Sequence, residues 1–172
     1  MDLEKELRAL HEESFQWALH CTEGRRSDAE DALQASYEAL LDGSARFEGR
    51  STLKSFLFGV IRNKARSLKR KRGFFRLISF DSLPEEGAAP KVERKIARSE
   101  EAAQIREAIE ACSPRQQAVL ELVFYHDLTL EEAAKVLGLG VGTVRTHYAR
   151  AKDTLRQRLA QGEKEWTATI RS

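Results

Sequence analysis

The chain has 172 residues and a formal net charge of +2, and 33% of its residues are charged, while ten are glycine and three are proline. A chain of this length can bury one sizeable core or two small ones, and this composition favours an all-α, soluble protein. No apolar run is long enough to span a bilayer and no signal peptide is visible, so we expect a cytoplasmic protein. Cys21 and Cys112 lie far apart and the four histidines are scattered, which predicts free thiols and no metal site.

The charged residues are distributed unevenly along the chain. Residues 1–46 carry eleven acidic and five basic side chains, whereas residues 62–76 carry eight basic side chains and no acid. This imbalance predicts that different faces of the protein meet different partners.

The acidic segment predicts two helices. Apolar residues recur at helical spacing over 2–22, with Trp17 as a large core side chain. Ser27 and Glu30 form a capping-box pattern that predicts the start of a second helix, SDAEDALQASYEALL. The apolar side of this helix contains Ala29, Leu33, Tyr37, Leu40 and Leu41. The opposite side contains Asp28, Asp31, Gln34 and Glu38, and its composition alone predicts no more than a solvated acidic face.

A third helix is predicted to start at Ser51 or Thr52. Its buried stripe contains Leu53, Phe56, Leu57, Val60, Ile61, Ala65 and Leu68. The second half, RNKARSLKRKR, is dense in cations that repel one another, so contact with phosphates is the favoured interpretation. A membrane-surface helix is the rival, but it needs an exposed apolar face, and this stripe is required for packing.

The helical periodicity fails over 73–92, which predicts a linker. Pro84 and Pro90 interrupt this segment, although its FFRLISF stretch is too apolar for a simple spacer. A helix is predicted from Lys91 to about Ala111, and Ser113-Pro114 predicts the next one with a capping box. The expected core residues of that helix are Val119, Leu120, Leu122, Val123 and Phe124.

The segment 128–159 predicts two helices joined by a tight turn. Thr129 and Glu132 form a capping box, and Gly138 stands where a left-handed residue ends the first helix. The second helix begins near Val141, with an apolar face of Val144, Tyr148, Ala151, Leu155 and Leu159. The outward face carries several long cations, a pattern that suits the DNA major groove and predicts a helix-turn-helix.

These segments, in this order, resemble bacterial sigma factors of the extracytoplasmic-function (ECF) group of the sigma-70 family, and the resemblance covers most of the chain. DAEDALQASYEALL resembles the region 2 helix that docks on the β′ clamp helices of RNA polymerase. RFEGRSTLKSFLFGVIRNKAR resembles the part that melts and reads the −10 promoter element, and 113–156 resembles region 4, which reads the −35 element. The resemblance implies two small helical domains joined by a flexible linker: 1–72 as region 2, 73–92 as linker, 93–162 as region 4, and 163–172 as a tail.

The resemblance also assigns site residues. Polymerase docking falls on Asp28, Glu30, Asp31 and Gln34. Contact with the −10 element falls on Phe47, Arg50, Ser51, Phe56, Asn63 and Lys64. Contact with the −35 element falls on Thr143, Arg145, Thr146, Arg150 and Lys152. The implied partners are core RNA polymerase, through its β′ clamp helices and β flap, promoter DNA and an anti-sigma factor, with no cofactor and no small-molecule substrate.

Two positions depart from the family pattern. Phe56 stands where Trp is usual, which keeps an aromatic ring but not Trp-specific stacking, and Gly140 stands where Ser commonly caps the recognition helix. Glycine at an N-cap costs only a few tenths of a kcal/mol relative to Ser, so we expect the helix to form.

Other functions fit part of the pattern. The sequence GTVRTH also resembles LuxR-type regulators, which bind DNA without docking on polymerase but usually carry an α/β domain. The first hundred residues here have no strand pattern. A membrane-associated or RNA-binding helical protein is a more distant alternative. We expect no enzyme, because there is no glycine-rich phosphate loop, plausible catalytic triad or metal spacing.

Overall fold

The computed structural model describes the backbone of residues 3–78 and 100–170 and the side chains of 3–73 and 103–161. Every element within these ranges is helical, and the helices form two compact units. The N-terminal unit contains α1 to α4, and the C-terminal unit contains α5, α6, α8 and the first half of α7. The predicted all-α architecture is confirmed.

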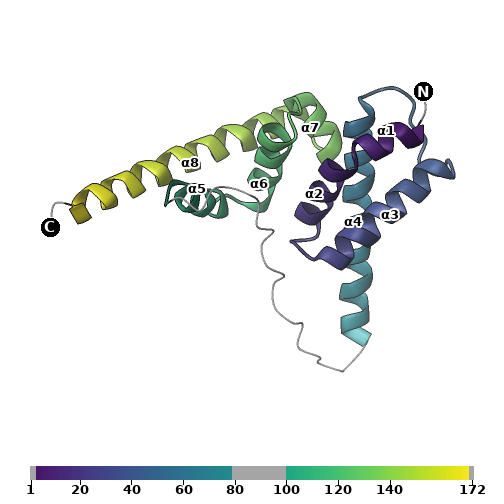
Figure 1. Ribbon diagram of the computed structural model, residues 1–172, viewed down its shortest axis with the longest axis horizontal. Coiled ribbons are helices and arrows are strands. Elements are labelled where there is room, and N and C mark those ends of the chain that lie inside the picture. The colour runs from purple at the N-terminus through teal and green to yellow at the C-terminus, as the bar shows by residue number, and fades with distance from the viewer. Residues whose placement is uncertain (1–2, 79–99, 171–172) are drawn as a thin grey trace. The chain divides into compact units, whose positions relative to one another are not determined.

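The N-terminal unit is built from α1 (Leu3–Ala9), α2 (His11–Cys21), α3 (Arg26–Leu41) and α4 (Leu53–Ile78). The helices α2, α3 and α4 pack against one another, and α1 contacts α2 (Figure 1). The prediction of one helix over 2–22 was wrong in one respect. Leu10 has a ψ of 0° and divides the segment into two helices.

Trp17 lies at the centre of the N-terminal unit. Its side chain is 1% exposed, its indole Nε1 donates to the Phe58 carbonyl oxygen at 3.0 Å, and its ring stacks on that of Phe58 with centroids 5.8 Å apart. Leu57 and Ile61 of the predicted α4 stripe are also fully buried, but Phe58, which contacts the tryptophan and is itself buried, was not predicted as part of that stripe. The prediction that Trp17 is a core residue is confirmed.

The start and end of α3 differ from the prediction. The helix begins at Arg26, and its N-cap, Arg25, makes no side-chain capping bond, so the predicted Ser27–Glu30 capping box was wrong. Glu30 instead pairs with Arg26 at 2.9 Å, one turn earlier on the helix surface. Leu41, predicted to be on the buried side, is 56% exposed because it is the last residue of the helix and lies beyond the packed core.

The helix α4 begins where it was predicted and ends later. The Thr52 hydroxyl accepts a hydrogen bond from the Ser55 amide at 3.3 Å, as an N-cap side chain does. The helix continues to Ile78, so residues 73–78 of the predicted linker are helical. Most of the FFRLISF stretch therefore extends α4, and the rest of the predicted linker lies outside the described residues.

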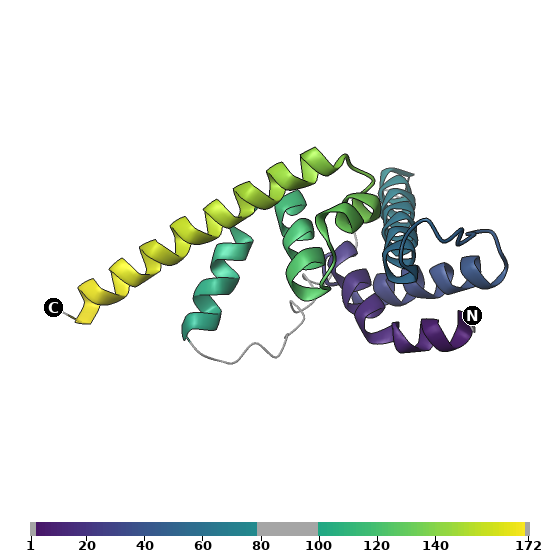
Figure 2. The ribbon, with the colours of Figure 1, turned by 90° about the horizontal axis from the view of Figure 1, so that it is seen from above.

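The C-terminal unit contains α5 (Glu100–Glu110), α6 (Pro114–Leu120), a π-helical turn η1 (Glu121–Tyr125), the first half of α7 (Leu130–Leu137) and α8 (Val141–Ile170). Figure 2 shows α5 and α6 both lying against α8. The predicted capping box of α6 is confirmed, because Ser113 and Gln116 exchange both side-chain bonds. The predicted tail is partly helical, since α8 continues to Ile170, whereas the predicted start of α5 near Lys91 lies outside the described residues.

The π-helical turn changes the orientation of the side chains that follow α6. Leu122 is buried as predicted, but Phe124, also predicted as core, is 62% exposed. A π-turn inserts extra backbone and shifts the helical phase, which a reading at 3.6 residues per turn does not include. As a result Glu121 and His126 face inward, with Oε1 and Nε2 3.6 Å apart.

Candidate nucleic-acid and protein interfaces

The outer face of α3 carries three of the four predicted docking residues. Glu30, Asp31 and Gln34 are exposed, whereas Ala29 and Leu33 are buried on the opposite side. The Gln34 side-chain amide donates to Glu38 at 2.9 Å, four residues further along the surface. This face is polar and acidic, and its exposure leaves it accessible to a basic partner.

Asp28 differs from the other docking candidates, because its side chain is only 11% exposed. Its two carboxylate oxygens accept from the Arg25 guanidinium at 2.7 Å and from the Arg72 guanidinium at 2.5 Å. A carboxylate with both oxygens occupied inside the unit has little surface to offer a partner. The structure thus gives Asp28 an internal role that the sequence did not predict.

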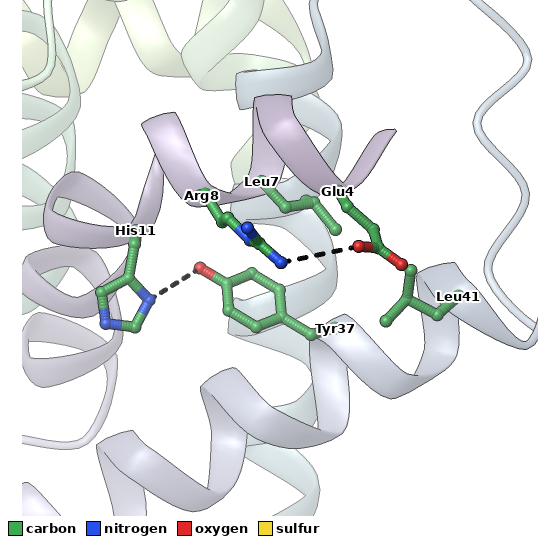
Figure 3. A pocket seen from close by; sticks show the side chains of 6 residues that line it. All are labelled: Glu4, Leu7, Arg8, His11, Tyr37 and Leu41. Carbon is green, nitrogen blue, oxygen red and sulfur yellow. Dashed lines mark hydrogen bonds and ion pairs between the residues drawn. The ribbon is translucent and has the colours of Figure 1, made fainter. Parts of the chain in front are cut away.

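A cleft of about 570 Å³ lies beside this face, between α1, the start of α2 and α3. Figure 3 shows its walls, where Leu7 and Leu41 are apolar and His11 Nδ1 lies 3.2 Å from the Tyr37 hydroxyl. Burial raises the pKa of Tyr37, so its phenol remains neutral at ordinary pH. Sequence analysis missed this cleft, because it placed Leu41 in the core.

The loop between α3 and α4 presents the predicted aromatic residue of the −10 site. The Phe47 ring lies 5.5 Å from that of Phe56 on α4, so the two predicted aromatic residues come together. Gly43 and Gly49 have φ values of +77° and +71°, which glycine adopts without steric cost and which let the loop fold back on the helix. Arg50 is exposed and pairs with its neighbour in the loop, Glu48, at 2.9 Å.

Three further predicted −10 residues lie close to this aromatic pair along the chain. Ser51 is half-buried, and its hydroxyl donates to the Thr52 carbonyl oxygen at 3.2 Å. Asn63 is exposed two turns beyond Phe56, on the same side of α4, and Lys64 is half-buried next to it. An exposed amide, cations and aromatic rings on one helix and its preceding loop can bind the backbone and bases of a single strand.

The helix-turn-helix has the predicted local geometry. The Thr129 hydroxyl accepts from the Glu132 amide at 3.2 Å, and the Glu132 carboxylate accepts from the Thr129 amide at 3.0 Å, which confirms the capping box. Gly138 has a φ of +60°, as predicted for the residue that ends α7. The Leu139 amide then donates to the Ala134 carbonyl oxygen at 3.0 Å, which completes the C-terminal cap.

The inner face of α8 is packed as predicted. Val144 and Ala151 are fully buried, and Tyr148 and Leu155 pack against a cluster that includes Cys112. Burial raises the pKa of the Cys112 thiol, which stays protonated. Fixing this face against α5 and α6 orients the opposite face of α8 toward solvent.

The outer face of α8 carries the predicted −35 residues. Those that are exposed are Thr143, Arg145, Thr146 and Arg150. The Arg145 guanidinium pairs with Glu131 of α7 at 3.0 Å, and the Lys152 ammonium lies 4.5 Å from the centroid of the Tyr148 ring. Arg145 and Lys152 are thus held by different neighbours, one a carboxylate and the other an aromatic face.

Metal chemistry and membrane insertion have no support in the described part of the chain. Within residues 3–73 and 103–161, no group of three or more His, Cys, Asp or Glu side chains could hold a metal ion. None of the described helices is both long and apolar enough to cross a membrane. The surfaces that remain are the acidic face of α3, the aromatic loop with the basic helix α4, and the basic face of α8.

Two family models match the chain in the same order as these surfaces. The model for sigma-70 region 2 matches residues 7–75, and the model for sigma-70 region 4 matches residues 102–155. The first match contains the α3 and α4 surfaces, and the second contains the helix-turn-helix. Together the two matches take in more than half of the chain.

Individual relatives agree with the family models. The chain is 27% identical to the ECF RNA polymerase sigma factor SigX of Bacillus subtilis (strain 168), over 87% of this chain and 79% of the relative. It is 27% identical to the ECF RNA polymerase sigma factor SigE of Mycolicibacterium smegmatis, over 83% of this chain but 56% of that longer relative. The LuxR alternative gains no support from these matches.

A solved structure shares the fold. The sigma factor RpoE from Bartonella quintana, crystallised with the anti-sigma factor NepR, superimposes with a TM-score of 0.71 at 24% identity. The similarity covers 92% of this chain and 97% of that chain, so both units are included.

Proposed function

The chain belongs to the extracytoplasmic-function group of the sigma-70 family of RNA polymerase sigma factors, and from that premise we propose which of its surfaces carry out each step of initiation. A sigma factor binds core RNA polymerase and promoter DNA, and it directs the enzyme to start transcription at specific promoters. The residue assignments that follow are the proposal.

Docking on core polymerase uses the outer face of α3. Glu30, Asp31 and Gln34 meet basic residues of the β′ clamp helices. All three are exposed on α3, and α3 packs against α2 and α4, which supports this assignment. We leave Asp28 out of the contact set, because both of its carboxylate oxygens are occupied by arginines of the same unit. The cleft next to Leu41 adds apolar surface to the same side of the unit.

Melting of the −10 element uses the loop and α4 together. The Phe47–Phe56 pair offers an aromatic surface to a flipped base, and Asn63 offers an amide that can both donate and accept. Arg50 and Lys64 supply charge for the strand's phosphates. The aromatic contact between loop and helix supports a single binding surface rather than two separate ones.

Reading of the −35 element uses α8. Arg145 and Arg150 lie on the exposed face of the first turns of this helix, where a guanidinium can bond the O6 and N7 atoms of one guanine. Thr143 and Thr146 are exposed on the same turns and suit base or phosphate contact. Lys152 lies further along, against Tyr148, and suits contact with the DNA backbone.

Regulation by an anti-sigma factor fits the same surfaces. The similar RpoE is found in complex with the anti-sigma factor NepR, and the sigma factor CnrH, with a TM-score of 0.58, in complex with the cytosolic domain of CnrY. We propose that this chain, too, is held by an anti-sigma factor, that it acts in the cytoplasm, and that it catalyses no reaction of its own.

The exposed acidic face of α3 is the observation that carries the docking proposal, and gel filtration with core polymerase tests it. The wild-type chain should co-elute with core enzyme, and Asp31→Lys should weaken this association without unfolding the protein, because exposed substitutions usually change stability by less than about 0.5 kcal/mol. Glu12→Lys, an exposed charge reversal on α2, is the control and should co-elute like wild type. Equal association of Asp31→Lys and wild type would show that α3 does not dock on polymerase.

A further inference from the structure

The basic half of α4 has two chemically different sides. Lys69 and Arg72 each pair with an acid of the same unit, Lys69 with Glu23 at 2.5 Å and Arg72 with Asp28 at 2.5 Å. Arg66 and Arg70 belong to the same run of cations, and within the described residues neither of them makes an ion pair. The cations of this helix are therefore not equivalent.

Glu23 lies in the turn between α2 and α3, and Asp28 lies in the first turn of α3. Glu23 has a φ of +59° and Gly24 a φ of +81°, so two consecutive residues are left-handed. The buried Thr22 hydroxyl holds the turn, because it lies 2.9 Å from the Ala18 carbonyl oxygen and 3.2 Å from that of Arg25. These bonds hold the backbone of Glu23, and the helical backbone of α3 holds that of Asp28.

The two pairs differ in exposure: the Lys69 and Glu23 side chains are 64% and 59% exposed, so their pair is weak, whereas the Asp28 side chain is only 11% exposed. The hydrogen bond from Lys69 is the main cause that holds the pKa of Glu23 below its ordinary value. Asp28 is buried, and Arg25 occupies its second oxygen, so this carboxylate orients the Arg72 guanidinium from a fixed site. The turn thus neutralises one side of the basic helix.

Helical geometry shows which side remains charged. At 100° per residue, Asn63, Arg66 and Arg70 lie within about 60° of one another around α4, whereas Lys69 and Arg72 lie about 120° and 180° from Asn63. The two unpaired arginines therefore continue the side of the helix that carries the proposed −10 contact. The two paired cations face the α2–α3 turn.

We propose that Glu23 and Asp28 are positioning residues that hold Lys69 and Arg72 against the α2–α3 turn, so that Arg66 and Arg70 face the phosphates of promoter DNA. This inference rests on the proposed contact between α4 and the −10 region. It follows that Lys69 and Arg72 displace no counterions from the DNA on binding. Sequence alone would group these two residues with Arg66 and Arg70 as equivalent cations.

The adjacent residues Lys69 and Arg70 provide a matched test. Holoenzyme assembled at saturating core polymerase is titrated with a promoter fragment at several salt concentrations, and the slope of log affinity against log salt is compared. Arg70→Ala should make the slope shallower by about 0.7 to 0.9, the loss of one phosphate contact, whereas Lys69→Ala should leave it unchanged. If both variants make the slope shallower by the same amount, the proposed difference between the paired and unpaired cations of α4 is overturned, but the proposed −10 contact is kept. No loss for either, together with no effect of Asn63→Ala, would overturn both.

Replacing the acid Glu23 provides a second test. Glu23→Gln removes the partner of Lys69, so the slope should become steeper, by at most about 0.7 to 0.9 because that is the value of one full phosphate contact, and the double variant Glu23→Gln/Lys69→Ala should return it to the wild-type value. Glu12→Gln removes the same charge from an exposed site on α2 and should change nothing. If Glu12→Gln steepens the slope as much as Glu23→Gln, the effect comes from net charge alone and the positioning role is refuted.

Discussion

Replacing Arg145 by alanine tests how α8 reads DNA. The guanidinium already pairs with Glu131 at 3.0 Å, but the two side chains are 64% and 57% exposed, so this pair contributes only about 0.2 to 1 kcal/mol. A bidentate bond to guanine contributes about 1 to 3 kcal/mol of discrimination, so the arginine should exchange the carboxylate for the base. We expect Arg145→Ala to lower affinity for the cognate −35 element by about 1 to 2 kcal/mol, which is about 5- to 30-fold.

The assay compares holoenzyme binding to two duplexes that differ only in the −35 element. Arg145→Ala should lose affinity for the cognate duplex and little for the mismatched one. Arg156→Ala is the matched control, because Arg156 is an exposed arginine on the same helix that also pairs with an acid, Asp153 at 3.1 Å, but lies three turns further along. If Arg145→Ala loses the same factor on both duplexes, Arg145 is a phosphate anchor and specificity must come from Thr146, Arg150 or the shape of the DNA.

Three further changes test the packing on which these surfaces rest. Trp17→Phe should lower the free energy of unfolding by about 1 to 3 kcal/mol in denaturant titrations, because it removes a buried hydrogen bond and leaves a small cavity. A loss under about 0.5 kcal/mol would contradict the proposed core. Gly138→Ala should cost about 1 to 2 kcal/mol, because alanine is strained at a φ of +60°, and Gly138→Asn should cost less; equal stability of all three proteins would refute this. In the native protein Cys112 should react with iodoacetamide more slowly than the half-exposed Cys21, because burial raises the pKa of the Cys112 thiol. After unfolding the two cysteines should react at similar rates. Faster labelling of Cys112 than of Cys21 in the native protein would disagree with the structure.

The features that sequence predicted well depend on residues close together in the chain. The capping boxes at Ser113 and Thr129 and the left-handed Gly138 each involve positions within about four residues. Their hydrogen bonds follow from residue type and spacing, so no knowledge of tertiary structure was needed.

The features that sequence missed depend on distant contacts or on irregular backbone. Asp28 was grouped with its exposed neighbours, but a partner 44 residues away, Arg72, makes it part of the interior. Ser27 had the residue type of an N-cap, yet the N-cap of α3 is Arg25, two residues earlier. Phe124 was assigned to the core because a π-turn cannot be recognised from a helical period.

The candidate site follows the same division. Sequence predicted the type and order of the surfaces, since an acidic helix face and a basic recognition helix are visible as patterns. It could not predict the contact between Phe47 and Phe56, which joins a loop to a helix, or the ion pair that holds Arg145 before DNA binds. Both depend on how the backbone folds between the residues concerned.

Promoter-specific transcription tests the central claim most directly. Core polymerase is reconstituted with the chain on genomic DNA of its host, and the 5′ ends of the transcripts are sequenced. The account predicts new start sites that share one −10 and one −35 element at a fixed spacing, and their loss when Asp31→Lys replaces the wild-type chain. Start sites identical to those of core polymerase alone, or new sites without shared upstream elements, would contradict it.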